Sequence, residues 1–492
     1  MSKKYLLGID NGGTVSKAAL FDLCGNQVMK KSVQIPIISH QDGFTERNLS
    51  QVKKANFDLI RDICEECDGE IVSVGLTGHG KGLYVLGDGG EFIYNGIGST
   101  DRRAIEYEVR WNSDDTARRI YGKTAQKVVG CQPVALLRWL KDNERDTYDK
   151  IRCVLSCKDM IRYFLTGETF AEYTDVSGTN LLNLNTREYD MDLLREFGIE
   201  EIYDCLPPVK SSGDICGYIS EECAEYTGLK KGTPVSGGMF DIDACAVAMG
   251  NILPGDLCMI AGTWSINEYV SEKPVCDRTV SMNSVFCDPS YYLCEESSAC
   301  SCGNLEWLRS LIKEDGYREL DEAVTGLSPA ACSVYYLPFL YASNENPYAK
   351  ASFIGLDGSH GTAHVARAVY EGVAFSHKTH LNALLKSRGV PEKIRLAGGV
   401  VNSAVWTQMF ADVMGIPMEI VKDAELGCKG AAMSAGIAAG VYSDYKDAVS
   451  KCVTVTGKIL PDAESTEIYE RKYNTYRKII TALDGVWEEL RK

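Results

Sequence analysis

The sequence predicts an α/β protein built from two domains. Its 492 residues exceed what one hydrophobic core usually supports, so two domains of roughly 200 to 250 residues are expected. A strand, a glycine turn and a second strand open the chain at residues 5–22, and the pattern returns at residues 257–270. Helical and strand-like apolar spacings alternate after the first of these patterns. A cleft between two such domains would be available to a ligand.

The chain opens with three predicted strands. Residues 5–9 form a compact apolar run, and residues 10–14 contain two consecutive glycines, which is typical of a tight turn. Residues 17–22 are predicted as the returning strand, and residues 27–33 as a third strand. The chain therefore begins with an antiparallel meander rather than with a strand-to-helix unit.

A helix and a buried strand follow. Between residues 50 and 67, apolar side chains recur at the spacing of one helical face. Residues 71–76 then form a continuous apolar run of strand length. This alternation predicts an α/β fold for the first domain.

The second half repeats the opening pattern. Residues 257–261 are predicted as a strand that runs into Gly262 and Thr263 and continues as a strand at residues 266–270. The repetition indicates an old duplication, and we expect the domains to comprise residues 1–250 and 251–492.

Four further elements are predicted near the end of the chain. A helix begins at residue 364, and a strand at residues 394–397 ends in Gly398 and Gly399 before a helix that starts near Ser403. Residues 464–490 are predicted as a closing amphipathic helix. Its apolar face could pack internally or against a second copy, so a homodimer is one alternative.

Composition narrows the class of protein. Lys and Arg total 52 against 68 Asp and Glu, and no basic stripe runs along the chain, so a nucleic-acid partner is not expected. No apolar run is long enough to cross a membrane, and the first one is too short for a signal peptide. We therefore expect a cytoplasmic protein with its nineteen cysteines reduced.

The glycine turns are candidate phosphate sites. A glycine turn presents backbone N–H groups to an anion because no Cβ blocks the approach and positive φ angles cost little. Gly12-Gly13-Thr14 and Gly262-Thr263 both suit this role, although each could be an ordinary hairpin. The loop at Gly398-Gly399 could let a flat nucleotide base pack against bare backbone, or could simply join a strand to a helix.

Two aspartates are candidates for the chemistry of phosphoryl transfer from ATP. That reaction needs one carboxylate to take the proton of the attacking hydroxyl and another to help hold Mg2+. Asp10 follows the first strand, and Asp241 follows the glycine pair at residues 237–238. Asp241 could also be the cap of an apolar helix predicted at residues 244–249.

Residues 75–82 nearly match the P-loop of nucleotide-binding proteins. Gly82 stands where a Ser or Thr hydroxyl should bind Mg2+, and residues 83–86 are predicted as a strand where a P-loop needs a helix. The P-loop is therefore rejected. His79 and Lys81 either line a ligand pocket after a buried strand or belong to a solvated turn.

With these motifs the chain resembles the FGGY family of carbohydrate kinases over essentially its whole length. Residues 351–356 and 364–372 are similar to the long C-terminal signature of the family, and residues 8–17 and 262–263 to its phosphate motifs. Residues 398–403 are similar to its adenosine motif. The resemblance implies two ribonuclease-H-like domains of the actin-like ATPase type around a central cleft. It also implies that the N-terminal domain binds the sugar and carries the first phosphate turn, and that the C-terminal domain binds the nucleotide.

The resemblance also implies roles for individual residues. Asp241 takes the position of the catalytic base, and Asp10 is expected to approach Mg2+, with Asp241 as the second carboxylate near the metal. The expected sugar-binding residues are His79, Lys81, Asp101, Arg103 and Asp241. The expected ATP-binding residues are Gly12, Gly13, Thr14, Lys17, Gly262, Thr263, Gly398, Gly399 and Asn402.

The resemblance therefore implies an enzyme that uses ATP and Mg2+ to phosphorylate a small sugar or polyol, with a ketopentose such as L-xylulose as the expected substrate. Other substrates of the same family, namely D-xylulose, ribulose, erythritol and gluconate, are alternatives. A non-catalytic sugar-binding regulator on the same scaffold is the alternative from another functional class.

Overall fold

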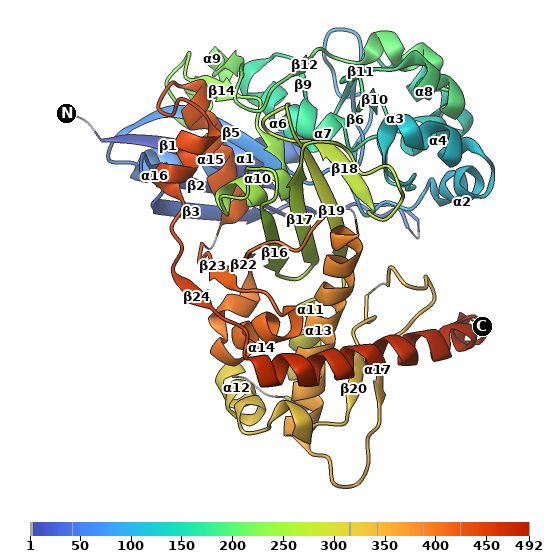
Figure 1. Cartoon of the computed structure of the whole chain (residues 1–492). Helices are drawn as coiled ribbons and strands as arrows, with labels where there is room; N and C mark the ends of the chain where they lie inside the picture. Colours follow the sequence, from blue (N-terminus) through green and yellow to red (C-terminus); the bar gives the residue numbers. More distant parts are fainter. Residues whose placement is uncertain are drawn as a thin grey trace. The chain divides into compact units, whose positions relative to one another are not determined.

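The computed structural model of the protein describes residues 3–491, except for residues 42, 314–315, 342, 387 and 424. It divides into two compact units (Figure 1). The first unit comprises Met1–Pro254, Val270–Cys294 and Glu425–Val453, and the second comprises Gly255–Tyr269, Glu295–Ala424 and Thr454–Lys492. The assignment of sugar binding to a domain of residues 1–250, and of nucleotide binding to a domain of residues 251–492, stays a prediction.

The first unit is built on a sheet in the order β13-β14-β5-β1-β2-β3, with β15 also paired to β5. The four strands predicted from the opening of the chain are confirmed as β1, β2, β3 and β5. Strand β1 runs antiparallel to β2 and parallel to β5, and β15 is parallel to β5. The strands are β1 (Lys4–Asn11), β2 (Val15–Asp22), β3 (Gln27–Gln34), β5 (Glu70–Gly78), β13 (Ile215–Tyr218), β14 (Pro234–Ser236) and β15 (Met239–Phe240).

Helix α1 (Leu49–Glu66) confirms the predicted amphipathic helix. The side chain of Asn48 caps it by accepting a hydrogen bond from the N–H of Gln51. Its apolar stripe, which includes Ile60, is buried with strand residues such as Leu7 in one hydrophobic core. The other helices of this unit are α2 (Ile105–Ser113), α3 (Thr116–Thr124), α4 (Pro133–Asn143), α5 (Arg145–Tyr148), α6 (Cys157–Thr166), α7 (Tyr173–Val176), α8 (Met191–Phe197), α9 (Glu221–Thr227), α10 (Asp241–Ala248), α15 (Leu426–Ala438) and α16 (Tyr445–Cys452).

Short strand pairs surround the main sheet of the first unit. The pairs are β4 (Glu46–Arg47) with β7 (Gly96–Ile97), β6 (Tyr84–Leu86) with β8 (Cys153–Leu155), β9 (Ala171–Glu172) with β12 (Val209–Lys210), and β10 (Leu182–Asn183) with β11 (Glu188–Tyr189); β18 (Met282–Val285) also lies in this unit.

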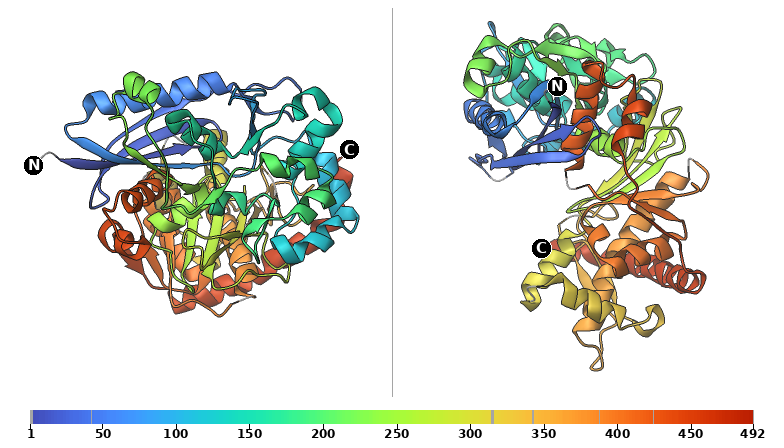
Figure 2. Two further views of the ribbon diagram at one scale, coloured as in Figure 1. Left: turned by 90° about the horizontal axis from the view of Figure 1, so that it is seen from above. Right: turned by 90° about the vertical axis from the view of Figure 1, so that its left-hand side faces the viewer.

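Helix α15 packs on the first sheet although it comes from late in the sequence (Figures 1 and 2, orange-red beside the blue strands). A Cβ atom added at Gly8 or at Gly75 would lie 1.9 Å from a carbonyl oxygen of α15. A Cβ atom at Gly430 of α15 would lie 2.0 Å from the carbonyl oxygen of Ala244 in α10. Only glycine permits such close approach of two backbones. The three glycines therefore seat α15 against β1, β5 and α10.

The second unit repeats the strand order that opens the first. Strand β16 (Leu257–Ala261) is antiparallel to β17 (Ser265–Ser271) and parallel to β22 (Ile394–Ala397), as β1 is to β2 and β5. This correspondence supports the predicted duplication. The remaining strands are β19 (Tyr292–Ser298), β20 (Tyr335–Leu337), β21 (Ser352–Ile354), β23 (Met418–Ile420) and β24 (Gly457–Ile459).

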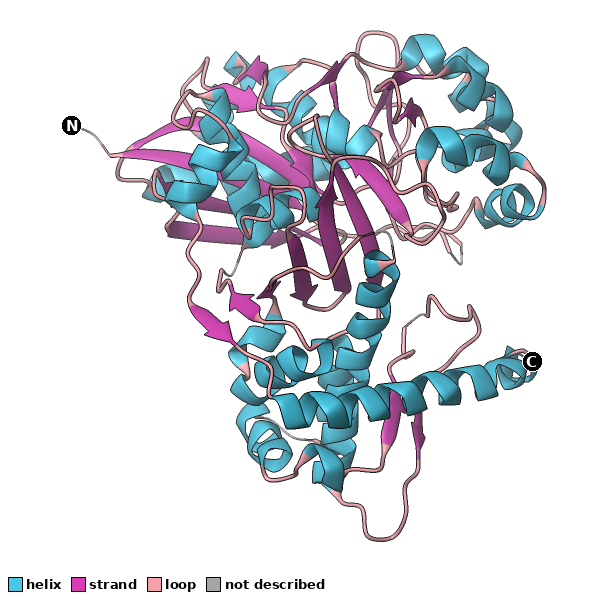
Figure 3. Cartoon of the chain, in the orientation of Figure 1, coloured by secondary structure: helices cyan, strands magenta, loops and turns pink. Residues whose placement is uncertain are grey.

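Helices supply most of the remaining regular structure of the second unit (Figure 3). The three helices predicted near the end of the chain are confirmed as α13, α14 and α17. Three tyrosines of α17, at positions 469, 473 and 476, lie against Phe375 of α13, so the apolar face of the closing helix packs internally. The helices are α11 (Gly303–Ile312), α12 (Tyr317–Thr325), α13 (Thr362–Leu385), α14 (Ala404–Met414) and α17 (Ala463–Trp487).

Two general features of the chain follow from the structure. Within the described ranges, no helix has both the length and the apolar character needed to cross a membrane. All nineteen cysteines lie in the described ranges and are free thiols. Most are buried or half-buried, as expected for small apolar side chains.

Candidate active site

Three parallel strands of the first unit end side by side. In the register of the sheet, Asn11 of β1 and Phe240 of β15 are both paired with Gly78 of β5. Asp10 lies at the end of β1, His79 follows β5, and Asp241 follows β15. The carboxyl ends of adjacent parallel strands are where ligands bind in open α/β sheets. The fold therefore brings these three predicted site residues to one edge of the sheet.

Asp241 is the first residue of helix α10 rather than its cap. The capping position is Phe240, whose N–H donates to the hydroxyl of Thr174 at 2.8 Å. The helix begins three residues before the predicted residue 244, because acidic side chains at 241 and 243 suit the positive end of the helix dipole. The same dipole favours the charged form of a carboxylate in the first turn, which is the form that a general base requires.

His79 is buried and held in one tautomer. Its Nε2 lies 3.2 Å from Nη1 of Arg47, which can only donate, so Nε2 accepts and Nδ1 carries the proton toward the carbonyl oxygen of Gly80. Burial lowers the pKa of His79, and the Arg47 guanidinium lowers it further. His79 is therefore neutral at pH 7. Both ring nitrogens have partners within the protein, so the ring shapes the site more than it offers free hydrogen-bonding groups.

Asp101 and Arg103 form a buried ion pair with each other. Arg103 donates to Asp101 from Nε at 2.9 Å and from Nη2 at 3.0 Å, and both side chains are fully buried. Asp101 also accepts from the backbone N–H of Thr45 at 2.7 Å, and Arg103 donates to Glu46 at 2.7 Å. The rings of Phe44, Tyr94 and Trp139 enclose the guanidinium. In this structure the pair fixes the loops at residues 43–47 and 98–103.

We expect Arg103→Lys to lower the free energy of unfolding by about 3 kcal/mol, because lysine cannot reproduce the forked hydrogen bonds to a buried carboxylate. Urea unfolding measures the change. Arg118→Lys is the matched control, since Arg118 pairs with Asp115 on the exposed surface. It should unfold like the wild type. Equal stability of both variants would contradict a structural role for the buried pair.

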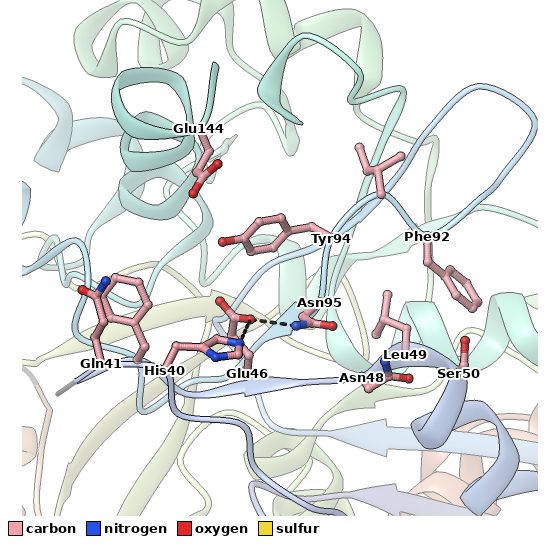
Figure 4. Close-up of a pocket in the computed structure, with 12 residues that line it drawn as sticks. His40, Gln41, Glu46, Asn48, Leu49, Ser50, Phe92, Tyr94, Asn95 and Glu144 are labelled. Atoms are coloured by element: carbon pink, nitrogen blue, oxygen red, sulfur yellow. Dashed lines mark hydrogen bonds and ion pairs between the residues drawn. The ribbon is translucent and has the colours of Figure 1, made fainter. Parts of the chain in front are cut away.

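A hollow of about 560 Å3 lies beside this ion pair in the first unit (Figure 4). Its floor includes Glu46, which accepts from Asn95 at 2.8 Å, with the ring of His40 at 3.9 Å. None of the predicted site residues lines it. Glu46 connects the hollow to Arg103, so the hollow borders the predicted sugar-binding region without containing it.

Asp10 lies against the first turn of α15. A Cβ atom at Gly427 would lie 2.8 Å from its carboxylate. Burial raises the pKa of the Asp10 carboxyl, and the ammonium of Lys17 acts in the opposite direction. Within the described part of the chain, the Asp10 carboxylate has no ion pair and accepts no hydrogen bond. Lys17 instead pairs with Glu425 at 3.0 Å.

The first glycine turn is open to a ligand. A Cβ atom at Gly13 would meet nothing within 4 Å, and the N–H groups of Gly13 and Thr14 have no acceptor among the described residues. The N–H of Gly12 is used within the hairpin, where it donates to the carbonyl oxygen of Val15 at 3.0 Å. Neither Gly12 nor Gly13 has a positive φ. The lack of side chains, rather than a left-handed backbone, therefore provides the access.

The second unit presents a comparable turn. A Cβ atom at Gly262 would also meet nothing within 4 Å, and Thr263 is exposed. Gly398 has a φ of +95°, and a Cβ there would lie 2.5 Å from the carbonyl oxygen of Ala261. This position requires glycine on both grounds.

A cavity of about 210 Å3 in the second unit includes Gly399 and Asn402 in its lining. Its walls include the three aromatic rings of Tyr317, Tyr370 and Trp406. Its polar edge is fixed by Asp321, which accepts from the hydroxyls of Tyr370 and Ser403, both at 2.7 Å. The lining suits a flat aromatic ring with a few hydrogen-bonding groups, such as a purine base. The full lining is Cys302, Leu305, Tyr317, Asp321, Tyr370, Gly399, Asn402, Ser403 and Trp406.

Two family models match the chain. Residues 5–248 match the N-terminal domain, and residues 257–439 the C-terminal domain, of the FGGY family of carbohydrate kinases. The chain belongs to this family. It is therefore a carbohydrate kinase, an enzyme that transfers a phosphoryl group from ATP to a sugar hydroxyl.

Individual relatives of this kinase cover nearly its whole length. The L-xylulose/3-keto-L-gulonate kinase of Escherichia coli is 36% identical over 98% of this chain and 98% of its own. A probable L-xylulose kinase of Haemophilus influenzae is 34% identical over 98% and 99%. The crystal structure of a xylulose kinase from Lactobacillus acidophilus has a TM-score of 0.93 and 23% identity, over 99% of this chain and 100% of that one. This last likeness confirms the predicted actin-like α/β fold.

Sequence reasoning missed several residues of these sites. Asp321, Tyr370 and Trp406 shape the cavity in the second unit, but their helical spacing is that of ordinary core residues. Gly427 lies against Asp10, and only the high content of small residues in α15 hinted that this helix packs closely on another backbone. Nothing in the sequence apart from its charge indicated a role for Glu46.

Proposed function

We propose that this kinase phosphorylates a hydroxyl group of a ketopentose such as L-xylulose. The observation that supports the proposal most is the 36% identity, over 98% of both chains, with a relative named for that sugar. Relatives named for xylulose and erythritol are only 24% to 26% identical. D-xylulose, ribulose, erythritol and gluconate therefore remain the alternative substrates within the family.

We assign the sugar to the first unit, near His79, Lys81, Asp101 and Asp241, with Asp241 as the general base. Its carboxylate would take the proton of the hydroxyl that attacks the γ-phosphate. The location of Asp241 at the ends of the parallel strands β1, β5 and β15 supports this role. Arg103 is assigned to the same region, where it positions Asp101.

ATP is assigned to the glycine-rich elements of both units. Gly12, Gly13, Thr14 and Lys17 of the first unit, and Gly262 and Thr263 of the second, are proposed to bind phosphates, and Gly398, Gly399 and Asn402 the adenosine. The open backbone at Gly13 and Gly262 supports the phosphate role. The aromatic cavity that Gly399 and Asn402 line supports the adenosine role.

Mg2+ fits the surroundings of Asp10. A buried carboxylate without an ion pair is a suitable oxygen donor for a hard cation, and Asp241 is the second carboxylate at the same sheet edge. Among the described residues, no group of three or more His, Cys, Asp or Glu side chains could hold a metal ion by itself. Mg2+ usually keeps several waters and binds substrate phosphates, so it needs few ligands from the protein. When bound, the ion supplies positive charge to the phosphate oxygens.

Two further assignments complete the proposal. A cytoplasmic location, where disulfides are rare, stays part of the proposal. A homodimer stays a prediction, and the internal packing of α17 removes the surface that first suggested it.

The test measures ADP release with Mg2+-ATP and one of L-xylulose, D-xylulose, L-ribulose, D-ribulose, erythritol, glycerol or gluconate. We expect L-xylulose to give a kcat/KM at least about tenfold above every other compound. Excess EDTA should abolish turnover. If a different sugar gives the highest kcat/KM, the proposed substrate is wrong but the proposed reaction, sugar phosphorylation, stands. Absence of sugar-dependent ADP release, together with a sugar-induced rise in Tm, would favour the non-catalytic regulator.

A further inference from the structure

A cluster of buried charges lies beside the proposed sugar site and contains one carboxylate in excess. Two cations, Lys158 and Arg162, face three carboxylates, and all five side chains are almost fully buried. The carboxylates are Asp159, Glu172 and Asp175. A buried carboxylate without compensation is unfavourable, so the excess charge requires a partner or a proton.

Two of the three carboxylates are well satisfied. Asp159 lies 2.8 Å from Lys158 and 3.0 Å from Arg162, and it accepts from the hydroxyl of Ser156 at 2.8 Å. Glu172 accepts from the N–H and the hydroxyl of Thr174 at 3.0 and 2.7 Å, and from the hydroxyl of Ser212 at 2.6 Å. The surplus is therefore not located on either of them.

Asp175 is the least well satisfied of the three carboxylates. It is 2% exposed, neither of its oxygens accepts a hydrogen bond from the described residues, and its ion pair with Lys158 is long, at 3.6 Å. Burial raises the pKa of Asp175 to about 6, although Lys158 opposes this. A buried carboxylate without a hydrogen bond in the protein is satisfied by a donor from water or a ligand, or by a proton.

Lys81 and Asp175 line the same small cavity, although they are far apart in the sequence. A space of about 20 Å3 is lined by Lys81, Asp175, Ser156 and Asp159, with mostly apolar side chains around them. Within the described part of the chain, the Lys81 ammonium has no ion pair. Lys81 also has a φ of +63°, an uncommon conformation for a lysine that marks a strained loop. The space suits a single oxygen atom with its hydrogen.

The cavity belongs to the neighbourhood of the proposed catalytic base. Asp175 lies in α7, and the preceding Thr174 accepts the hydrogen bond from the N–H of Phe240, the residue before Asp241. The charges of Asp175 and Asp241 both act on His79. Lys81 follows His79 by two residues. A sugar bound at Asp241 is therefore close to the loop that carries Lys81.

We propose that this cavity is a subsite for one hydroxyl group of the sugar, whose oxygen accepts a hydrogen bond from Lys81 and whose O–H donates to Asp175. A hydroxyl group is both donor and acceptor, so it satisfies the cation and the carboxylate together. The inference rests on the proposed function and adds a source of substrate selectivity to it. A site built around a substrate hydroxyl rejects an analogue that lacks it, because its buried polar groups then stay unpaired.

The test uses the full-length enzyme, its best sugar, and the analogues in which one hydroxyl at a time is replaced by hydrogen. In the wild type, kcat/KM for one analogue should fall about a hundredfold or more. Asp175→Ala should raise the KM for the sugar about tenfold or more and leave the KM for ATP within about twofold. In this variant the loss of kcat/KM for that same analogue should fall below about tenfold. A purely structural role would not remove selectivity at one hydroxyl.

Lys81→Met is the second variant and should lose the same selectivity even if Asp175→Ala folds poorly. Asp192→Asn is the control, because Asp192 is an exposed carboxylate of α8 paired with Arg195, and it should match the wild type for every analogue. If Lys81→Met, or a folded Asp175→Ala, keeps the full loss of kcat/KM for that analogue, the subsite proposal is wrong. The proposed function would not be affected by that result. A wild type that phosphorylates no sugar would refute the proposed function and the subsite with it.

Discussion

Asp241→Asn should lower kcat for sugar phosphorylation by about a hundredfold or more, the loss expected when a general base is removed. Asparagine keeps the size of the side chain at the first position of α10 but cannot accept the proton of the attacking hydroxyl. The KM for ATP should change less than kcat, because the glycine turns and the cavity assigned to ATP are elsewhere and Asp241 is only the second carboxylate assigned to Mg2+. ADP release at saturating sugar and ATP measures the change in kcat.

The control for this substitution is Asp192→Asn. Asp192 also lies in the first turn of a helix, α8, but its side chain is exposed. The control should retain full activity, and both variants should unfold within a few degrees of the wild type. A folded Asp241→Asn enzyme with near-normal kcat would refute the assignment of the base and would direct attention to another carboxylate at the ends of β1, β5 and β15.

Local patterns predicted the framework of the fold well. The strands at residues 4–11 and 70–78 and the helix at residues 49–66 each carry their own signal, namely a short apolar run or a one-sided apolar stripe. The start of α10 was placed three residues late, since Asp241 is polar and does not contribute to an apolar pattern. Acidic side chains at the positive end of the helix dipole, rather than hydropathy, favour that boundary.

Contacts between distant segments were beyond sequence reasoning. Asp101 and Arg103 were predicted as sugar ligands from a resemblance, and nothing in their spacing indicates that they pair with each other and with Thr45 and Glu46. Asp175 had no distinguishing pattern either. Its significance depends on the count of buried charges around it, which only the folded chain reveals.

The return of α15 to the first sheet leads to a prediction about stability. Gly75→Ala should lower the free energy of unfolding by about 3 kcal/mol, because its Cβ atom would overlap the carbonyl oxygen of Ala431 and the helix would have to move. The expected fall in Tm is about 6 °C or more. Activity should fall as well, since α15 also places Gly427 beside Asp10.

Gly122→Ala is the matched control for a glycine that packs on nothing. Gly122 lies in α3, and a Cβ atom there would meet nothing within 4 Å. Alanine is the better helix former by about 1 kcal/mol, so this variant should be as stable as the wild type or slightly more so. Thermal unfolding of both variants, with sugar-dependent ADP release, separates the two effects. If Gly75→Ala and Gly122→Ala unfold alike, close backbone contact is not what seats α15 on the first sheet. If only Gly75→Ala loses both stability and activity, the late segment at residues 425–453 is part of the catalytic unit.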